Sequence, residues 1–249
     1  MNVGLFVPCF IDQFYPQVAI ATMELLKKHG CTVHYPLNQT CCGQPMANAG
    51  FATMSTKCDK NFIENFKSFD YIVAPSGSCV LHIKDHLHST TDEIEATRIR
   101  NRIYELTEFM TDVLKIEKLL AHFPHKVGLH PGCHGQRGLH TSSMSELVDS
   151  SFSKPEKLLA MVKGLQLTKA KRADECCGFG GTFCVTEEAV SVKMGKDRIK
   201  EHTDNKVDYI TSGDSSCLMH LEGILKRQQS SIQVIHIAEI LNADRYASN

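Results

Sequence analysis

The chain has 249 residues, a formal net charge of −1 and 22% charged residues, which is typical of a globular protein with one large domain or two small ones. A near-neutral chain without a long basic run lacks the positive patch that non-specific nucleic-acid binding needs, so we expect no nucleic-acid partner. The N-terminal sequence MNVGLFVPCF has no signal-peptide pattern and no apolar run approaches about 18 residues, so we expect a cytoplasmic protein without a membrane span.

The first half of the chain alternates short apolar segments with amphipathic ones. Apolar residues bounded by turn-forming residues predict strands, and apolar residues at helical spacing predict helices. The predicted strands are Val3–Val7, Thr32–Tyr35 and Tyr71–Ala74, and the predicted helices are Tyr15–His29 and Met46–Phe66.

A middle segment separates the two halves. Glu93–Leu120 carries apolar residues at helical spacing, which predicts one or two connecting helices that pack on both halves. We therefore divide the chain into a first module (residues 1–92), a connecting helical segment (93–120) and a second module (121–249).

The second half repeats the alternation of the first. Its predicted strands are Lys126–His130, Leu165–Thr168, Val207–Thr211 and Ile232–Ile237, and its predicted helices are Pro155–Lys163, Glu187–Thr203 and Ser215–Arg227. Strands that alternate with helices are joined by right-handed crossovers into parallel sheets. The sequence therefore predicts an α/β protein of two pseudo-symmetric Rossmann-like repeats with mainly parallel sheets.

Cysteine is unusually frequent for an expected cytoplasmic chain. There are eleven cysteines, and in a reducing compartment clustered cysteines indicate metal or redox chemistry rather than disulfides. Eight of them follow predicted strands in the same order in each half: one cysteine, a Cys-Cys-Gly run, and one cysteine. We expect these eight at the carboxyl ends of the strands, where parallel sheets build their sites. They are Cys9, Cys41, Cys42 and Cys79 in the first half and Cys133, Cys176, Cys177 and Cys217 in the second.

The two cysteine sets indicate an internal duplication. Cys9 and Cys133 are 124 residues apart, Cys42 and Cys177 are 135 apart, and Cys79 and Cys217 are 138 apart, so the second copy carries short insertions. Four thiolates are the minimum full set for an iron–sulfur cluster or for a tetrahedral zinc ion. Both kinds of metal centre are open at this point, and we predict all eight cysteines as ligands.

Glycine follows the paired cysteines in both halves. Gly43 and Gly178 allow positive φ and a close approach of the backbone to an inorganic centre. The run Gly178–Gly181 offers backbone amides for hydrogen bonds to cluster sulfurs. It lacks the Lys-Ser/Thr pair of a phosphate-binding P-loop, so we discount phosphate binding there.

The other cysteines and the histidines carry weaker signals. We expect Cys31 and Cys58 in the core, and Cys184 is a candidate extra ligand. The spacing of His82, His86 and His88 predicts a shared, solvated helix face. His134 directly follows Cys133 and either donates a hydrogen bond to the centre, lines its pocket or is structural. No catalytic triad or nucleotide-binding fingerprint is present, so catalytic residues stay unassigned.

Four sequence motifs in this chain resemble those of a known protein family. The chain resembles the cysteine-rich "CCG" domain of heterodisulfide reductase B-type subunits and glycolate oxidase iron–sulfur subunits. It is most similar to the small iron–sulfur subunits of lactate-utilisation systems, from Met1 to the last predicted strand. The motifs are QTCCGQP (Gln39–Pro45), PSGSC (Pro75–Cys79), RIYELTEF (Arg102–Phe109) and ECCGFGGTF (Glu175–Phe183).

The resemblance implies that the eight cysteines hold iron–sulfur clusters, one in each module. The fullest family pattern has a fifth cysteine per module, and this chain has Ser76 and Asp214 at those positions. Four thiolates favour an ordinary [4Fe–4S] cluster, and an oxygen ligand from Ser76 or Asp214 is the alternative. The nuclearity therefore stays open.

The resemblance also implies a function. It indicates an electron-transfer subunit of an oxidoreductase complex that oxidises L-lactate to pyruvate. Its partners would be the other iron–sulfur subunits of the lactate-utilisation system, and L-lactate is a candidate ligand of the chain itself. Two alternatives stay open: a thiol/disulfide redox enzyme like heterodisulfide reductase, and a scaffold subunit that binds zinc.

Overall fold

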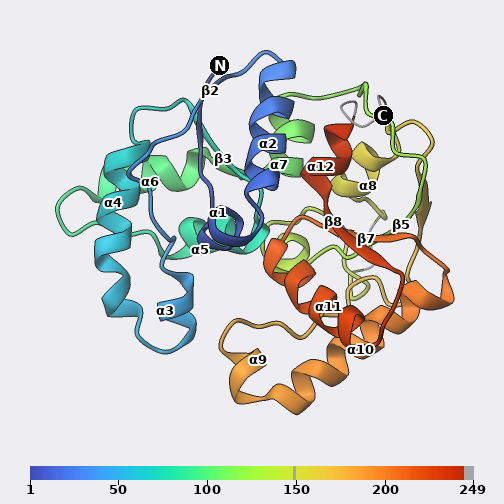
Figure 1. The fold of residues 1–249 in the computed structure, drawn as a ribbon. Helices are drawn as coiled ribbons and strands as arrows, with labels where there is room; N and C mark the ends of the chain where they lie inside the picture. The colour runs from blue at the N-terminus through green and yellow to red at the C-terminus, as the bar shows by residue number, and fades with distance from the viewer. Residues whose placement is uncertain (148–149, 244–249) are drawn as a thin grey trace.

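The computed structural model describes residues 1–147 and 150–243, and in this part of the chain the strands form two parallel four-stranded sheets (Figure 1). The first sheet has the order β2-β1-β3-β4 and the second has the order β6-β5-β7-β8. The predicted α/β fold of two Rossmann-like repeats is confirmed. The strands are β1 (Asn2–Leu5), β2 (Thr32–His34), β3 (Tyr71–Ala74), β4 (Ile103–Glu105), β5 (Lys126–Leu129), β6 (Gln166–Thr168), β7 (Tyr209–Ser212) and β8 (Gln233–His236).

The two sheets repeat the same pairing register. In the first sheet Val3 pairs with Tyr71, and in the second Val127 pairs with Tyr209. Val3 and Val127 are 124 residues apart, the same interval that separates Cys9 from Cys133. The central strands of the two halves are therefore equivalent residue by residue up to the first cysteine of each set.

Helices connect the strands of both sheets. In the first half they are α1 (Cys9–Phe14), α2 (Pro16–Lys28), α3 (Gln44–Asn48), η1 (Ala52–Ser55), α4 (Thr56–Phe66), α5 (Gly77–His86), α6 (Glu93–Arg102), α7 (Leu106–Glu108) and η2 (Phe109–Val113). In the second half they are η3 (His134–Gly138), α8 (Lys154–Leu159), α9 (Phe183–Thr186), α10 (Glu188–Asp204), α11 (Ser215–Arg227) and α12 (Ile237–Leu241). No helix of the described ranges is long and apolar enough to cross a membrane.

Two predicted helical segments differ in the structure. The predicted helix Met46–Phe66 is divided into α3, η1 and α4, because Gly50 adopts a positive φ of +87° that interrupts the helix. The predicted connecting helices 93–120 contain the strand β4, where Ile103 pairs with Ile72 of β3. Pairing in the sheet overrides the helical spacing of the flanking residues. The module boundaries at residues 92 and 121 stay a prediction.

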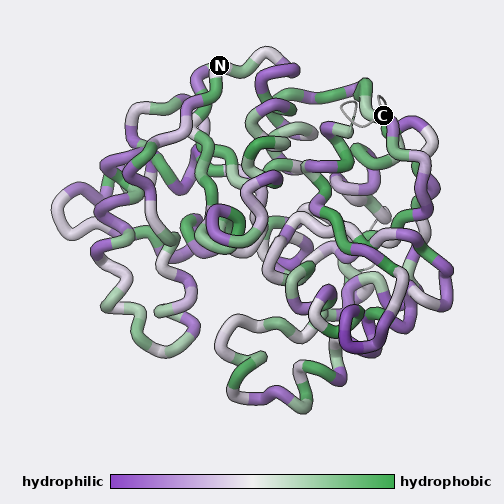
Figure 2. The backbone as a smooth tube through the Cα atoms, viewed as in Figure 1, coloured by the Kyte–Doolittle hydropathy of each residue, from purple (hydrophilic) through white to green (hydrophobic). Residues whose placement is uncertain are grey.

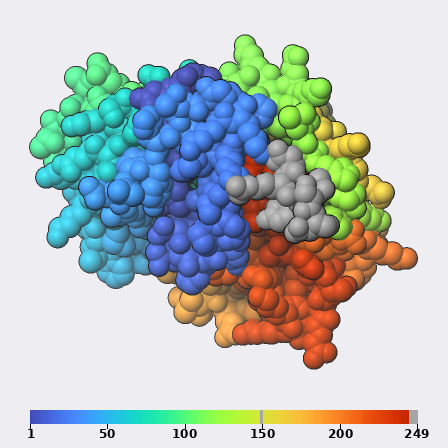
Figure 3. All heavy atoms as spheres, turned by 45° about the horizontal axis from the view of Figure 1, so that its top comes forward, coloured from blue at the N-terminus to red at the C-terminus, as the bar shows by residue number. Residues whose placement is uncertain are grey.

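A shared hydrophobic core joins the two halves. The largest cluster of buried side chains includes Val3 and Phe109 from the first half and Val127, Leu158 and Ile240 from the second. A helix near the end of each half packs on the other half, α12 on α2 and α7 on α8. Figure 2 shows hydrophobic residues along the central strands and hydrophilic residues on the peripheral helices, and Figure 3 shows one continuous body. The shared core therefore fixes how the carboxyl ends of the strands in the two sheets lie relative to each other.

Candidate metal centres

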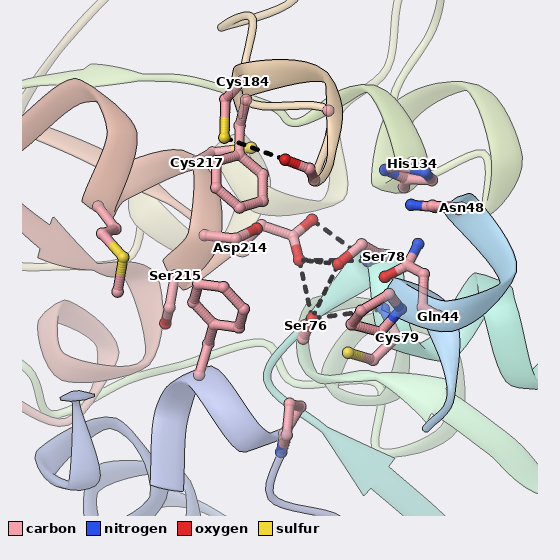
Figure 4. A pocket seen from close by; sticks show the side chains of 18 of the residues that line it. Gln44, Asn48, Ser76, Ser78, Cys79, His134, Cys184, Asp214, Ser215 and Cys217 are labelled. Atoms are coloured by element: carbon pink, nitrogen blue, oxygen red, sulfur yellow. Dashed lines mark hydrogen bonds between the residues drawn. The ribbon is translucent and has the colours of Figure 1, made fainter. Parts of the chain in front are cut away.

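One cavity of about 980 Å³ is lined by all eight predicted cysteines. Figure 4 shows part of its lining, with Cys79 and Cys217 among the labelled residues. Cys9 opens α1 directly after β1, and Cys79 lies in the first turn of α5 after β3. Cys133 immediately precedes η3 after β5, and Cys217 lies in the first turn of α11 after β7. The paired cysteines follow β2 and β6. The structure thus brings the eight sulfur atoms together beyond the carboxyl ends of the strands of both sheets.

The thiols of each set contact one another in a row. In the first set Cys9 Sγ lies 3.7 Å from Cys41 Sγ, and the thiol of Cys42 contacts those of Cys41 and Cys79. Hydrogen bonds from the thiols of Cys42 and Cys9 hold the pKa of Cys41 well below its ordinary value. A depressed pKa stabilises the thiolate, which is the form that binds metals. Cys41 is therefore a ready ligand.

The second set repeats this arrangement. The thiol of Cys176 contacts those of Cys133 and Cys177, and the thiol of Cys177 also contacts that of Cys217. Hydrogen bonds from the Cys133 and Cys177 thiols hold the pKa of Cys176 well below its ordinary value. Each half thus presents one thiolate in contact with two thiols, and the fourth thiol contacts one of these two.

Both Cys-Cys turns depend on the glycine that follows. Gly43 has φ +92° and Gly178 has φ +90°, a conformation that favours glycine. The backbone N–H of Gly43 donates to Cys41 Sγ at 3.4 Å, and that of Gly178 donates to Cys176 Sγ at 3.3 Å. A Cβ atom on Gly178 would lie 2.6 Å from the carbonyl oxygen of Ser191. These bonds support the thiolates in both sets.

Two equivalent histidines lie beside the Cys-Cys-Gly turns. The sequence analysis missed this role of the histidines. His82 on α5 is only 5% exposed, so the predicted solvated face is wrong for this residue, although His86 and His88 are exposed. His82 lies against the backbone of Cys42, and His220 lies against that of Cys177 with its Nε2 3.3 Å from the Ser191 carbonyl oxygen. The repeated Cys-x-x-His spacing in α5 and α11 was the available signal.

Ser76 and Asp214 meet between the two cysteine sets. Ser76 Oγ and Ser78 Oγ each donate to Asp214 Oδ1 at 2.8 Å, and the Ser78 backbone N–H donates to the same carboxylate (Figure 4). Both Ser76 and Asp214 are buried. The two residues at the fifth-cysteine positions are thus bonded to each other and link the halves.

Of the remaining residues that the sequence analysis named, some line the cavity and others lie away from it. His134 and Cys184 line the cavity; His134 Nδ1 lies 3.7 Å from Cys133 Sγ, and Cys184 Sγ donates to the Gly181 carbonyl oxygen at 3.0 Å. Cys31 lies in the core as predicted. Cys58 on α4 is only half-buried. The ligand role of Cys184 stays a prediction.

His130 is a further candidate that the sequence analysis missed. Within the described residues, His130, Cys177 and Cys217 form the one group of three potential metal ligands whose donor atoms lie within 4.8 Å of one another. His130 is 1% exposed, and neither ring nitrogen has a hydrogen-bond partner. Burial, with the nearby charge of Arg198, lowers the pKa of His130 to about 3, so its ring is neutral. The sequence gives no signal for His130, because it lies at the end of a predicted apolar strand, whose residues are expected in the core.

Two copies of a parallel α/β unit, each with a Cys-Cys-Gly turn and two single cysteines at one strand edge, define a duplicated cysteine-rich protein. The sequence pattern of the cysteine-rich domain CCG matches residues 3–84 and 127–222. Proteins described as lactate utilization protein A are similar over nearly the whole chain. That of Bacillus licheniformis is 39% identical over 98% of this chain and 100% of its own length. That of Geobacillus kaustophilus is 40% identical over 98% and 99%.

The chain therefore belongs to the lactate utilization protein A family of CCG-domain proteins, as the sequence motifs predicted. Among solved structures, the glutamate racemase RacE1 of Bacillus anthracis aligns with 98% of this chain and 80% of its own. Its identity of 12% and its TM-score of 0.39 are too low for that likeness to carry any argument.

Proposed function

We propose that this chain is an iron–sulfur electron-transfer subunit of a complex that oxidises L-lactate to pyruvate. The observation that carries the proposal is the pair of equivalent four-thiol sets that line one cavity. The lactate pathway comes from the relatives, which are described as lactate utilization proteins. Partner subunits with iron–sulfur centres of their own would exchange electrons with this chain at the cavity.

The four thiols of each set do not converge as the ligands of a single zinc ion do. Four thiolates around one zinc ion lie roughly 3.8 Å from one another, because the Zn–S bond is about 2.3 Å. Within the described residues, no three thiols of either set all lie within 4.8 Å of one another. Two neighbouring thiols lie at a distance that zinc ligands share, as in the 3.7 Å between Cys9 Sγ and Cys41 Sγ, but neither set as a whole converges on one ion. The eight cysteines would hold two iron–sulfur clusters, one for each set.

The surrounding residues suit such centres. When bound, two clusters supply two one-electron carriers, and two is the number of electrons released when a 2-hydroxy acid becomes a 2-oxo acid. The N–H groups of Gly43 and Gly178 point at thiolate sulfur atoms and stabilise their negative charge. The rings of Phe10 and Phe179 pack edge to face, 5.8 Å apart, and cover part of the cavity with apolar surface.

The cavity mouth offers apolar surface for a partner protein. Phe14 of α1 and Val185 of α9 both line the cavity, and they are 63% and 78% exposed. Exposed apolar residues gathered at one site are characteristic of interaction surfaces. Docking at this mouth would bring a partner's redox centre close to the cysteine sets.

The proposal is tested with anaerobically purified chain, alone and mixed with the other subunits of the lactate system. We expect L-lactate to generate an EPR signal of reduced cluster in this chain only when those subunits are present. Cys42→Ser and Cys177→Ser should each remove the iron of one set, whereas Cys31→Ser, in the core, should retain it. Full iron content in both ligand variants, or a centre that L-lactate does not reduce with all subunits present, would contradict the proposal.

A thiol/disulfide redox enzyme is the second candidate, because both cysteine sets open into a single cavity. A substrate disulfide in that cavity would contact both centres at once. This candidate predicts that the isolated chain reduces 2-hydroxyethyl disulfide with a reduced viologen as electron donor. If the isolated chain contains both clusters but does not reduce the disulfide, the thiol/disulfide enzyme is ruled out.

A further inference from the structure

The two cysteine sets have different neighbours at two equivalent positions. Because the strand registers repeat at an interval of 124 residues, His130 corresponds to Phe6 and His134 corresponds to Phe10. The second set is therefore flanked by two imidazole rings where the first set is flanked by two phenyl rings. An imidazole can donate an N–H hydrogen bond to sulfur, and a phenyl ring cannot.

Phe6 makes the surroundings of the first set apolar. It is fully buried and packs edge to face on Phe62, with the ring centroids 4.9 Å apart. Phe6 and Phe62 belong to the same buried cluster as Cys42, and Cys41 and Cys79 pack against that cluster. The first set therefore receives no side-chain hydrogen bond from this side.

His130 gives the second set a different neighbour. One of its ring nitrogens lies within 4.8 Å of the sulfur atoms of Cys177 and Cys217, and neither nitrogen has a partner in the protein. Buried polar groups in native proteins are nearly always paired, so an unpaired buried imidazole beside two thiols points to a partner at those sulfurs. His134 adds a second ring nitrogen, 3.7 Å from Cys133 Sγ.

The other polar groups near the two sets are either matched in both sets or charges that the histidine variants leave unchanged. The turn histidines His82 and His220 and the N–H groups of Gly43 and Gly178 are equivalent, so their effects are matched. The charge of the buried Arg198 guanidinium also acts on Cys177, but it is the same in the wild-type protein and in the histidine variants, so those variants separate its effect from that of the histidines. The Asp214 carboxylate acts on Cys133 of the second set and opposes reduction of that centre, so the hydrogen bonds from the histidines must outweigh its effect. The two histidines are therefore the specific donors to the second set.

We propose that His130 and His134 donate hydrogen bonds to the sulfur atoms of the second centre and give it a higher reduction potential than the first. This inference rests on the proposed iron–sulfur function. Hydrogen bonds to cluster sulfurs stabilise the reduced form because it carries more negative charge. Electrons that reach this chain would then settle on the second centre. Both histidines are positioning residues in this account.

The test is an EPR-monitored redox titration. Titration of the wild-type protein should show two separate steps, and Cys42→Ser, which removes the first centre, should leave only the step at higher potential. The variant His130→Phe/His134→Phe copies the first set, so we expect the higher step to move down until the two steps merge. His130→Gln retains an N–H donor and should preserve most of the separation. The control Phe10→Leu should leave the higher step in place.

Pulsed EPR on reduced protein labelled with ¹⁵N-histidine provides a second readout that a merely structural role would not change. We expect a weak nitrogen coupling that is lost in the double variant. His134→Phe, at a half-buried cavity position, guards against misfolding of the double variant and should move the higher step part of the way down.

An unchanged separation in a double variant with full iron content would overturn the inference and leave the proposed function standing. So would a coupling as strong as that of an imidazole bound to iron. Wild-type protein that contains neither iron nor sulfide after anaerobic purification would remove the proposed function and this inference together.

Discussion

The glycine after each cysteine pair sets the geometry of its turn. Gly178 has φ +90°, and a side chain there would be strained by the backbone as well as crowded by the Ser191 carbonyl oxygen. Gly43 has nearly the same φ, and a Cβ there would lie 2.8 Å from Ser55 Cβ. At this scale the sequence was a reliable guide, because a glycine that follows paired ligands has a specific conformational meaning.

Gly178→Ala should therefore destabilise the protein by about 1–3 kcal/mol, the range for a non-glycine residue held in a left-handed conformation. It should also lower the metal content of the second set, because the N–H bond to Cys176 Sγ depends on the turn. Urea unfolding and metal analysis measure both effects. Gly223→Ala is the matched control, since nothing lies within 4 Å of its added Cβ on α11. Equal losses of stability in both variants would contradict the account.

At the scale of elements, a side-chain hydrogen bond connects the N-terminal ends of α5 in the first half and α11 in the second. Ser76 precedes α5 and accepts from the Cys79 backbone N–H, and Asp214 precedes α11. The 2.8 Å bond between Ser76 Oγ and Asp214 Oδ1 ties these two helices together. Cys79 and Cys217 lie three residues further along each helix, so this link helps to fix the distance between the two cysteine sets.

Asp214→Asn should lower the free energy of unfolding by about 1.5–3 kcal/mol, the range for a hydrogen bond to a charged group. The amide would accept fewer bonds than the carboxylate and would weaken those from the hydroxyls of buried Ser76 and half-buried Ser78. Denaturant unfolding measures the change. Asp204→Asn, at an exposed pair with Lys200 on α10, should change stability by less than about 1 kcal/mol. If both variants lose the same amount, the link does not contribute to stability.

Elements with a clear local signal were predictable from the sequence. β3 and α11 have the predicted bounds, because a buried apolar run and an amphipathic run each end at distinct turn residues. β4 was missed because its three residues lie between two amphipathic segments and become a strand only by pairing with β3. His130 was missed because its chemistry depends on Cys177 and Cys217, which the fold brings to it from distant parts of the sequence.

At the scale of the whole molecule, the duplicated halves depend on each other. Each half places a helix near its end against the other, and the largest hydrophobic cluster includes residues of both. A protein with one shared core should unfold as a unit. The relative placement of the cysteine sets is therefore a property of the complete chain.

Ile240→Ala in α12 should destabilise the protein by about 2–5 kcal/mol, because it opens a cavity in the shared core. We expect amide hydrogen exchange to accelerate together in the first-half strands and the second-half strands. Protection that is lost only in the second half would show that the halves fold independently. Exposed Val190→Ala on α10 is the control and should have little effect.

The central claim is that the two cysteine sets hold iron–sulfur clusters, and metal and acid-labile sulfide analysis of anaerobically purified protein tests it most directly. Our account predicts iron and sulfide in comparable amounts, enough for two clusters per chain, and little zinc. The Cys42→Ser and Cys177→Ser variants should each retain about half of both. Zinc without sulfide, at one ion for each cysteine set, would contradict the claim.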